Sequence, residues 1–318
     1  MKIHQIFILI LFTLSLCAVP KASVFALTLS PVRIEIAGDP GQTLHGEIEI
    51  YNEQSEQKTF YTTFENFEPS GEDGAPKFVG GGSELATWIQ PEETVVLAPS
   101  EKRTVAYTIT IPEGTEPGGY FGAVFFGGQN PDTLENGEVS VGGKLGTLVL
   151  LTVRGDIEEG AGILDFGANI GRVGVYLPIS FSYRMSNDGA DRIVPRGDIR
   201  ITNTFGMTTV SIPANELEGS ILPESARRFT SVWAGTNGPG AGFFDAVRYE
   251  WENLHIGWYT AHARVAWGTQ DGVSTARYDF LLIPWHLLVV CMFLGVALTY
   301  GLNRYNTWII KRSKTNSK

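Results

Sequence analysis

The residue types that most often carry catalysis or bind metals are sparse in this chain and match none of the common motifs. Apart from the two chain ends, the histidines are His45, His255 and His262, and none stands in a His-Glu-x-x-His or comparable ligand spacing. Both cysteines, Cys17 and Cys291, lie in apolar segments near the ends, so neither can complete a zinc site with these histidines. Gly-x-Ser-x-Gly, a motif of serine hydrolases, is absent. We therefore expect no catalytic residues, no metal site and no cofactor.

Carboxylates are numerous and leave two chemical alternatives open. Glu65, Glu68, Glu72 and Asp73 lie close together in sequence, and on an acidic surface such groups ordinarily serve solvation. A glycosidase uses two carboxylates that are distant in sequence, so a hydrolase remains the least favoured alternative. Calcium binding at Glu72 and Asp73 is the other alternative, although no loop with alternating oxygen ligands is present.

Aromatic residues are the more suggestive feature, because exposed rings often mark carbohydrate or protein partners. Four of the seven tryptophans lie between residues 233 and 267. Of these, Trp233, Trp258 and Trp267 are predicted to belong to the core. The stretch 235–253 has no counterpart in the first half of the chain. We expect it to be an insertion that binds a partner through Phe243, Phe244, Tyr249 and Trp251.

The composition favours β-structure and excludes one class of partner. The 318 residues include 37 Gly and 16 Pro, which weaken helix interiors, so a turn-rich β architecture is favoured over a helix bundle. A hydrophobic share of 43% is enough to fill a core. The formal charge of -10 argues against nucleic acid as a partner, since contact with phosphates needs a basic surface.

The two ends of the chain carry targeting signals. Residues 1–26 combine Lys2, an apolar run and a small-residue pattern that ends at Ala26, which predicts a secretory signal peptide. Residues 280–303 contain no Asp, Glu, Lys or Arg, so we predict a transmembrane helix there. Residues 304–318 hold five Lys or Arg and no acid, and the positive-inside rule places this basic tail in the cytoplasm. We expect a single-pass protein of the plasma membrane with its ectodomain outside.

The ectodomain, residues 27–279, is strongly acidic. It holds 17 Lys or Arg against all 34 Asp or Glu, a formal charge of -17. We expect this surface to stay soluble and to repel anionic polymers. The ectodomain contains no cysteine, so its fold depends on a hydrophobic core and not on disulfides.

Short alternating runs separated by turn residues fill the ectodomain and predict an all-β fold. Residues 44–50, 104–111 and 179–185 place apolar side chains on one parity and polar side chains on the other. We identify no long amphipathic helix before residue 280. Surface loops are expected at 66–83 and 127–144, where Gly, Asn, Asp and Pro accumulate.

Three landmarks recur in one order and indicate an internal duplication, with chance similarity among turn residues as the alternative. The pairs are 97–104 with 221–228, 119–124 with 257–262, and Asn52 with Asn187. We therefore predict two tandem immunoglobulin-like β-sandwiches, 27–156 and 157–279, with their joint near 154–162. Gly119 and Gly257 are expected to open a central strand in each sandwich, with the rings of Tyr120 and Trp258 packed across the core.

The order of signal peptide, two sandwiches, membrane helix and basic tail resembles the WxL-interacting protein family of bacterial cell surfaces. The similarity covers nearly the whole chain. Its segments are Leu29-Ser30-Pro31-Val32-Arg33, Trp88 with Leu97-Ala98-Pro99, Ile111-Pro112 with Pro117-Gly118-Gly119-Tyr120-Phe121-Gly122, Gly197-Asp198-Ile199, Phe205-Gly206, and Leu222-Pro223-Glu224-Ser225 with Arg227. The resemblance implies that the first domain contacts peptidoglycan and the second holds a protein partner. The expected function is a non-enzymatic, membrane-anchored adhesion or scaffold protein that binds cell-wall glycan or a secreted surface protein.

A second likeness, to PapD-like pilus chaperones, supplies the alternative function. These chaperones also begin with a proline-bearing strand and pair two immunoglobulin-like domains, which implies an assembly chaperone that lends a strand edge to its client. Arg33 is the one candidate for their subunit-anchoring basic residues. They are soluble, so the predicted membrane helix counts against this alternative.

Overall fold

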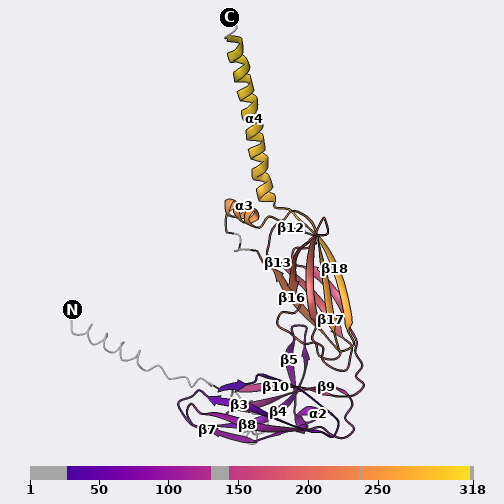
Figure 1. Ribbon diagram of the computed structural model, residues 1–318. Coiled ribbons are helices and arrows are strands. Elements are labelled where there is room, and N and C mark those ends of the chain that lie inside the picture. The colour runs from indigo at the N-terminus through magenta and orange to yellow at the C-terminus, as the bar shows by residue number, and fades with distance from the viewer. Residues whose placement is uncertain (1–26, 130–142, 236–237, 239, 316–318) are drawn as a thin grey trace, which may run out of the picture.

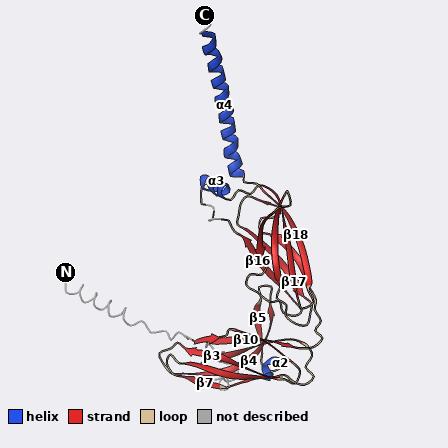
Figure 2. Ribbon diagram, viewed as in Figure 1, coloured by secondary structure: helices blue, strands red, loops and turns tan. Residues whose placement is uncertain are grey.

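The computed structural model describes residues 27–129, 143–235, 238 and 240–315, so the expected signal peptide lies outside the described residues. This part of the chain forms two β-sandwiches and one long C-terminal helix (Figure 1). Strands dominate both sandwiches, and the helices lie mainly at the C-terminal end (Figure 2). The sequence predicted an all-β fold, and the structure is mostly β, with the two predicted sandwiches followed by an apolar helix.

The first sandwich consists of two sheets around one hydrophobic core. One sheet has the strand order β1-β3-β8-β6, and the other has the order β2-β10-β9-β4-β5, with β7 also paired to β4. The strands are β1 (Leu27–Ser30), β2 (Arg33–Gly38), β3 (Thr43–Asn52), β4 (Lys58–Ser70), β5 (Ala75–Gly80), β6 (Ile89–Pro91), β7 (Thr94–Leu97), β8 (Lys102–Thr110), β9 (Gly118–Gly127) and β10 (Lys144–Val153). Ile48 and Ile50 of β3 and Val105 and Ile109 of β8 are buried in this core. The two half-buried strands predicted in this part of the chain are thus confirmed.

The second sandwich pairs a three-stranded sheet with a five-stranded one. Their strand orders are β11-β13-β16 and β12-β18-β17-β14-β15. The strands are β11 (Ala161–Ala168), β12 (Val173–Gly174), β13 (Ile179–Asn187), β14 (Arg196–Asn203), β15 (Thr208–Pro213), β16 (Ser225–Trp233), β17 (Gly257–Trp267) and β18 (Gly272–Leu282). Phe181, Tyr183 and Met185 of β13 are fully buried, as their parity predicts, and the Phe181 ring lies 5.6 Å from that of Phe280 in the opposite sheet.

One buried asparagine occupies the same place in each sandwich. Asn52 Nδ2 donates to the carbonyl oxygens of Leu97 at 3.3 Å and Ala98 at 2.9 Å, and Asn187 Nδ2 donates to that of Ile221 at 3.0 Å. Leu97 and Ile221 are the residues that open the two similar sequence segments. Each asparagine thereby ties the end of one strand to the start of the matching turn, which supports the internal duplication.

The segment 66–83 was predicted to be a surface loop, and this prediction is wrong. The later part of β4 pairs with β5 as a hairpin that reaches toward the second sandwich (Figure 1). At its tip Glu72 lies 2.5 Å from Arg184 Nε and 3.5 Å from Arg228 Nη2, and the Glu72 carbonyl accepts the Arg228 N–H at 2.8 Å. Because these partners belong to the other domain, sequence patterns within the segment could not reveal the hairpin's role. Most of the second expected loop, 127–144, lies outside the described residues.

A second group of contacts joins the sandwiches beside their connecting segment, residues 154–160. Arg192 Nη2 lies 2.6 Å from a Glu35 carboxylate oxygen, and Thr152 Oγ1 donates to Asp191 at 2.8 Å. The Gly119 N–H donates to the carbonyl oxygen of Ala190 at 2.9 Å. We call this junction between the two sandwiches the elbow. Together with the Glu72 contacts, these interactions hold it at two places and stabilise the bent arrangement in Figure 1.

A helix that the sequence analysis did not predict lies within the insertion 235–253. α3 (Phe243–Glu252) has ten residues and buries Ala246, Tyr249 and Glu250. Aromatic residues favour strands by intrinsic preference, and here packing against the rest of the protein overrides that preference. A one-turn helix, α2 (Glu84–Trp88), follows β5.

The long helix α4 (Trp285–Thr315) begins five residues after the predicted start of the membrane span. Phe280 and Leu282 are fully buried because they complete β18 in the second core. The apolar part of α4, Trp285–Ile309, is long and apolar enough to cross a membrane, with a mean hydropathy of 1.9.

Asn52→Ala and Asn187→Ala are each expected to lower the free energy of unfolding by about 1–3 kcal/mol, because each change removes two or more hydrogen bonds from a buried amide to backbone carbonyl oxygens. Chemical denaturation of the full chain in detergent measures the loss. Gln57→Ala, which removes an exposed amide in the turn after Asn52, is the control and should change the value by less than about 0.5 kcal/mol. Asparagine variants that behave like the control would contradict this role.

The double variant Glu35→Ala/Glu72→Ala is expected to broaden the distribution of distances between the two sandwiches, because it removes ion pairs at both attachment places of the elbow. Pulsed EPR between spin labels at the exposed positions Gln57 and Thr209 measures this distribution in a chain whose Cys291 is replaced by Ser.

The matched control for the elbow removes two other acids, Glu47 and Glu68, which are exposed and form no ion pair among the described residues. Their double alanine variant should retain the width of the unmodified chain. Equal widths for both double variants would show that the ion pairs do not fix the elbow.

Candidate functional site

The outer face of the five-stranded sheet carries a regular array of polar side chains. β17 lies between β14 and β18, and its Tyr259 and Ala261 point into the core, so its even-numbered residues point outward. The strand register aligns the outward residues of the three strands in rows. From the end nearest α4 these rows are Thr202, Thr260 and Asp279; then Arg200, His262 and Arg277; then Asp198, Arg264 and Thr275. We call this surface the arginine face.

The arginine face forms a shallow hollow of about 560 Å³ that is open to solvent. Arg200, Arg264 and Arg277 are exposed there. Asp198 lies 3.6 Å from Arg200, whereas the Arg264 side chain has no ion pair or hydrogen bond with any described residue. Because two carboxylates face three guanidinium groups, the surface carries a net positive charge even with a neutral histidine.

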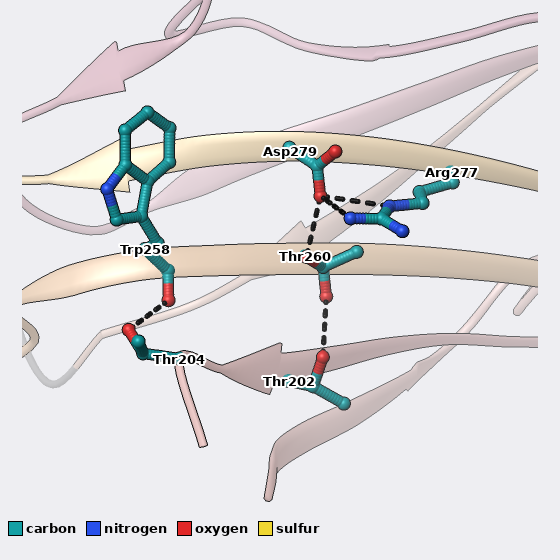
Figure 3. A network of polar contacts seen from close by, with 6 residues as sticks. All are labelled: Thr202, Thr204, Trp258, Thr260, Arg277 and Asp279. Carbon is teal, nitrogen blue, oxygen red and sulfur yellow. Dashed lines mark hydrogen bonds and ion pairs between the residues drawn. The ribbon is translucent and has the colours of Figure 1, made fainter. Parts of the chain in front are cut away.

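A network of polar contacts fixes one edge of the arginine face (Figure 3). Thr260 Oγ1 donates to Asp279 Oδ1 at 2.6 Å, and Arg277 Nε donates to the same oxygen at 3.0 Å. The hydrogen bond from Thr260, followed by that from Arg277, lowers the pKa of Asp279 below its usual value. Asp279 therefore stays ionised in mild acid and remains paired with Arg277.

This arrangement is chemically suited to an anionic ligand. Guanidinium groups bind carboxylate and phosphate through paired N–H donors, and threonine hydroxyls both donate and accept hydrogen bonds. Arg264 has the most binding capacity left, because its side chain has no ion pair or hydrogen bond with the described part of the chain.

Trp258 lies beside these rows, and the prediction that its ring packs across the core is wrong. Its ring is 58% exposed, whereas the neighbouring Tyr259 is buried, so Trp258 does not pack across the core. The expected central strand does begin at Gly257, and Thr204 Oγ1 donates to the Trp258 carbonyl oxygen at 3.1 Å (Figure 3). Of the other predicted core tryptophans, Trp233 is buried and Trp267 packs partly buried against the core.

The four residues predicted to bind a partner lie together on α3 and not on the arginine face. Phe243, Phe244 and Trp251 are exposed, whereas Tyr249 is buried with its ring 5.7 Å from that of Tyr176. Arg200, Arg264 and Arg277 were not among the predicted binding residues. The available signal was their alternation with apolar and aromatic residues, which places each of them on the outward side of its strand.

The calcium alternative receives no support from the surroundings of Glu72. Glu72 contacts two arginines of the second sandwich, which compete with any cation for its oxygens. Within the described ranges, no group of three or more His, Cys, Asp or Glu side chains has the spacing of a metal site.

A smaller cleft of about 270 Å³ lies between the β4–β5 hairpin and the second sandwich. Arg33 and Arg227 line it together with apolar residues that include Phe67 and Leu150. Arg33 Nε lies 3.1 Å from Glu35, and burial lowers the pKa of Arg227. The cleft is thus the place of the arginine that the chaperone likeness suggested.

Comparisons with known proteins give a distant structural likeness. Neither the family models nor the curated proteins match the sequence. Among solved structures, the chain is similar to the class 5 fimbriae chaperone CfaA at 12% identity, over 81% of this chain and 100% of that chain, with a TM-score of 0.39. It is also similar to the CsuC-CsuE chaperone-tip adhesion subunit complex of Acinetobacter baumannii, at 9% identity over 81% and 99% of the chains, with a TM-score of 0.36. At these TM-scores the likeness carries no argument about function.

Thr260→Val is expected to raise the pKa of Asp279 toward its ordinary value, because the change removes the hydrogen bond that lowers it most. Carboxyl-carbon NMR of labelled aspartate in a pH titration measures the shift. Since the folded pKa is lowered, Asp279 stabilises the fold above its unfolded pKa, and this contribution is lost as the pH falls through the folded value. Thr275→Val, on the same face but in another row, should leave the Asp279 titration unchanged; a shift there of equal size would contradict the assignment.

Proposed function

We propose that the protein is a membrane-anchored cell-surface module that binds an anionic cell-wall glycan through the arginine face. The observation that carries the proposal is the row Arg200, His262 and Arg277 on an otherwise acidic ectodomain. Next to this row lies Arg264, whose side chain has no partner among the residues that the structure describes. Residues 27–156 hold seven Lys or Arg against twenty acids, whereas residues 157–279 hold ten Arg against fourteen acids. The second sandwich is therefore the better suited of the two to a polyanion.

The shape of the face also favours an extended polymer. Its rows run across three neighbouring strands without a deep pocket, so successive sugar units would meet successive rows. The exposed Trp258 ring adds an apolar platform of the kind on which sugars stack.

Location supports the same class of ligand. α4 is the proposed membrane anchor, and the basic tail after residue 304 is expected to stay in the cytoplasm, which leaves both sandwiches outside. The resemblance to WxL-interacting proteins suggests a bacterial surface with peptidoglycan as the glycan. It assigns glycan contact to the first domain, whereas the charge distribution favours the second.

Arg264→Ala is expected to weaken retention of the full chain in nanodiscs on purified anionic wall glycan by about tenfold, since charge-assisted hydrogen bonds contribute about 1.5–3 kcal/mol each. Asp279→Asn should act in the opposite direction and strengthen retention, because it releases Arg277 and removes one negative charge. Both effects should shrink with rising salt.

Arg172→Ala is the matched control, because Arg172 is an exposed arginine of the same sandwich that does not line the hollow. It should change retention little. Equal losses for Arg172→Ala and Arg264→Ala would contradict the proposal. Since binding without turnover is proposed, the glycan should keep its chain length during incubation; shortened chains would instead support the hydrolase alternative.

The chaperone alternative predicts a different result in the same preparation. It needs an unpaired strand edge, and β2 is the edge strand next to β10. The ion pairs of Glu35 with Arg33 and Arg192 disfavour addition of a strand there, because charged side chains protect sheet edges. Co-purification of one exported protein that is unaffected by Arg264→Ala would favour the chaperone over the glycan binder.

A further inference from the structure

Helix α3 lies beside the start of α4, at the end of the second sandwich from which α4 emerges (Figure 1). Its Tyr249 ring packs against Tyr176 of the sandwich. Glu250, whose side chain is 0% exposed, contacts His286 Nδ1 at 2.6 Å and accepts the Leu287 N–H at 2.7 Å. The carboxylate thus meets one of the free N–H groups in the first turn of α4, where the helix dipole also favours a negative charge. α3 is fixed to both the sandwich and the long helix.

α3 has three distinct sides, and only two of them have an evident role. At 3.6 residues per turn, they are a buried side of Ala246, Tyr249 and Glu250, a polar side of Asp245, Arg248 and Glu252, and an apolar side of Phe243, Phe244, Val247 and Trp251. Arg248 and Glu252 form an ion pair at 2.8 Å on the polar side. We call the apolar side the α3 stripe.

The α3 stripe is an exposed apolar surface. Phe244 is 79% exposed and Trp251 is 68% exposed, and the Trp251 side chain has no ring contact or hydrogen bond with any described residue. A helix that only covered the sandwich would need apolar residues on its buried side alone. Large rings on a separate, outward side indicate a second apolar environment.

We propose that the α3 stripe lies in the outer interface of the lipid bilayer that α4 crosses. The stripe is continuous with the proposed span, because the Phe243 ring lies 6.3 Å from Trp285 and 5.5 Å from His286 in the first turn of α4. Glu250 holds α3 at this level, so lipid around α4 meets the stripe. Aromatic residues are enriched at this depth of the bilayer, and helices with one apolar side bind there.

The charges of α3 bear on whether it binds lipid headgroups or the apolar region beneath them. The helix carries Asp245, Glu250 and Glu252 against Arg248 alone, so attraction to anionic headgroups is not its source of affinity. The stripe instead buries its rings at the boundary between headgroups and acyl chains, and its docking is insensitive to headgroup charge. Because α3 is fixed to the sandwich, this contact sets the orientation of the ectodomain on the membrane.

The test uses the full chain in phosphatidylcholine nanodiscs with or without bromine on the upper acyl chains. Trp251→Phe isolates the emission of Trp251 as a difference from the unmodified chain. We expect bromine to quench this difference emission and aqueous iodide to leave it largely intact. Trp267→Phe is the control, because Trp267 lies at the far end of β17 from α4; its difference emission should be the same in both lipids.

The inference rests on the proposed anchoring by α4, and the two can fail separately. Trp285 and Trp308 report anchoring, since their difference emission should be quenched by bromine wherever α3 lies. Quenching of these two without quenching of Trp251 would overturn the α3 stripe alone, and a Trp251 emission open to iodide would do the same. Replacing phosphatidylcholine by anionic lipid should not change the result; a dependence on headgroup charge would contradict the apolar mode of docking.

Discussion

The burial of Glu250 is the constraint on which the membrane end of this structure depends. It is the only fully buried charged residue in the part of the chain that the structure describes, and a buried carboxylate is costly unless partners replace its water. Both partners, the His286 ring and the Leu287 N–H, belong to α4. Loss of α4 would remove both partners of Glu250, so α3 depends on the long helix for its place. In return, α4 receives a fixed direction as it leaves β18.

That direction determines where the arginine face stands. β18 runs into α4 within a few residues, so the row that contains Asp279 lies nearest the proposed membrane span. At about 3.4 Å per residue, Arg264 lies about 20 Å farther along β17 than Trp258. With α4 as the proposed anchor, a ligand on the face would lie outside the lipid, where the proposed glycan would meet it. In these proposals the α3 stripe and the arginine face serve different environments because one sandwich holds them at different heights.

Much of this fold follows from the alternation of apolar and polar residues along its strands. The wrong prediction for Trp258 shows that this alternation outweighs the size of a side chain. Parity predicted the buried residues of β3, β8 and β13 correctly, because a half-buried strand has a period of two. For β17 the prediction placed Trp258 in the core because of its large ring, against the alternation of the strand. Ala261, Ala263 and Val265 share the parity of Tyr259, which would have placed Trp258 outside. The place of α3 was not readable, since it depends on a carboxylate whose partners lie 36 and 37 residues later.

The arginines of the second sandwich form two separate sets, one at the elbow and one on the proposed binding surface. An acidic first sandwich on a loose joint would be an intramolecular competitor for any anionic ligand of the arginine face. The elbow avoids this because a separate set of arginines, Arg184, Arg192 and Arg228, engages Glu35 and Glu72. Arg184 and Arg228 lie on the three-stranded sheet and Arg192 lies between β13 and β14, whereas the hollow of the arginine face is lined by residues of the second sandwich. The positive rows there remain available to a polymer from outside the molecule.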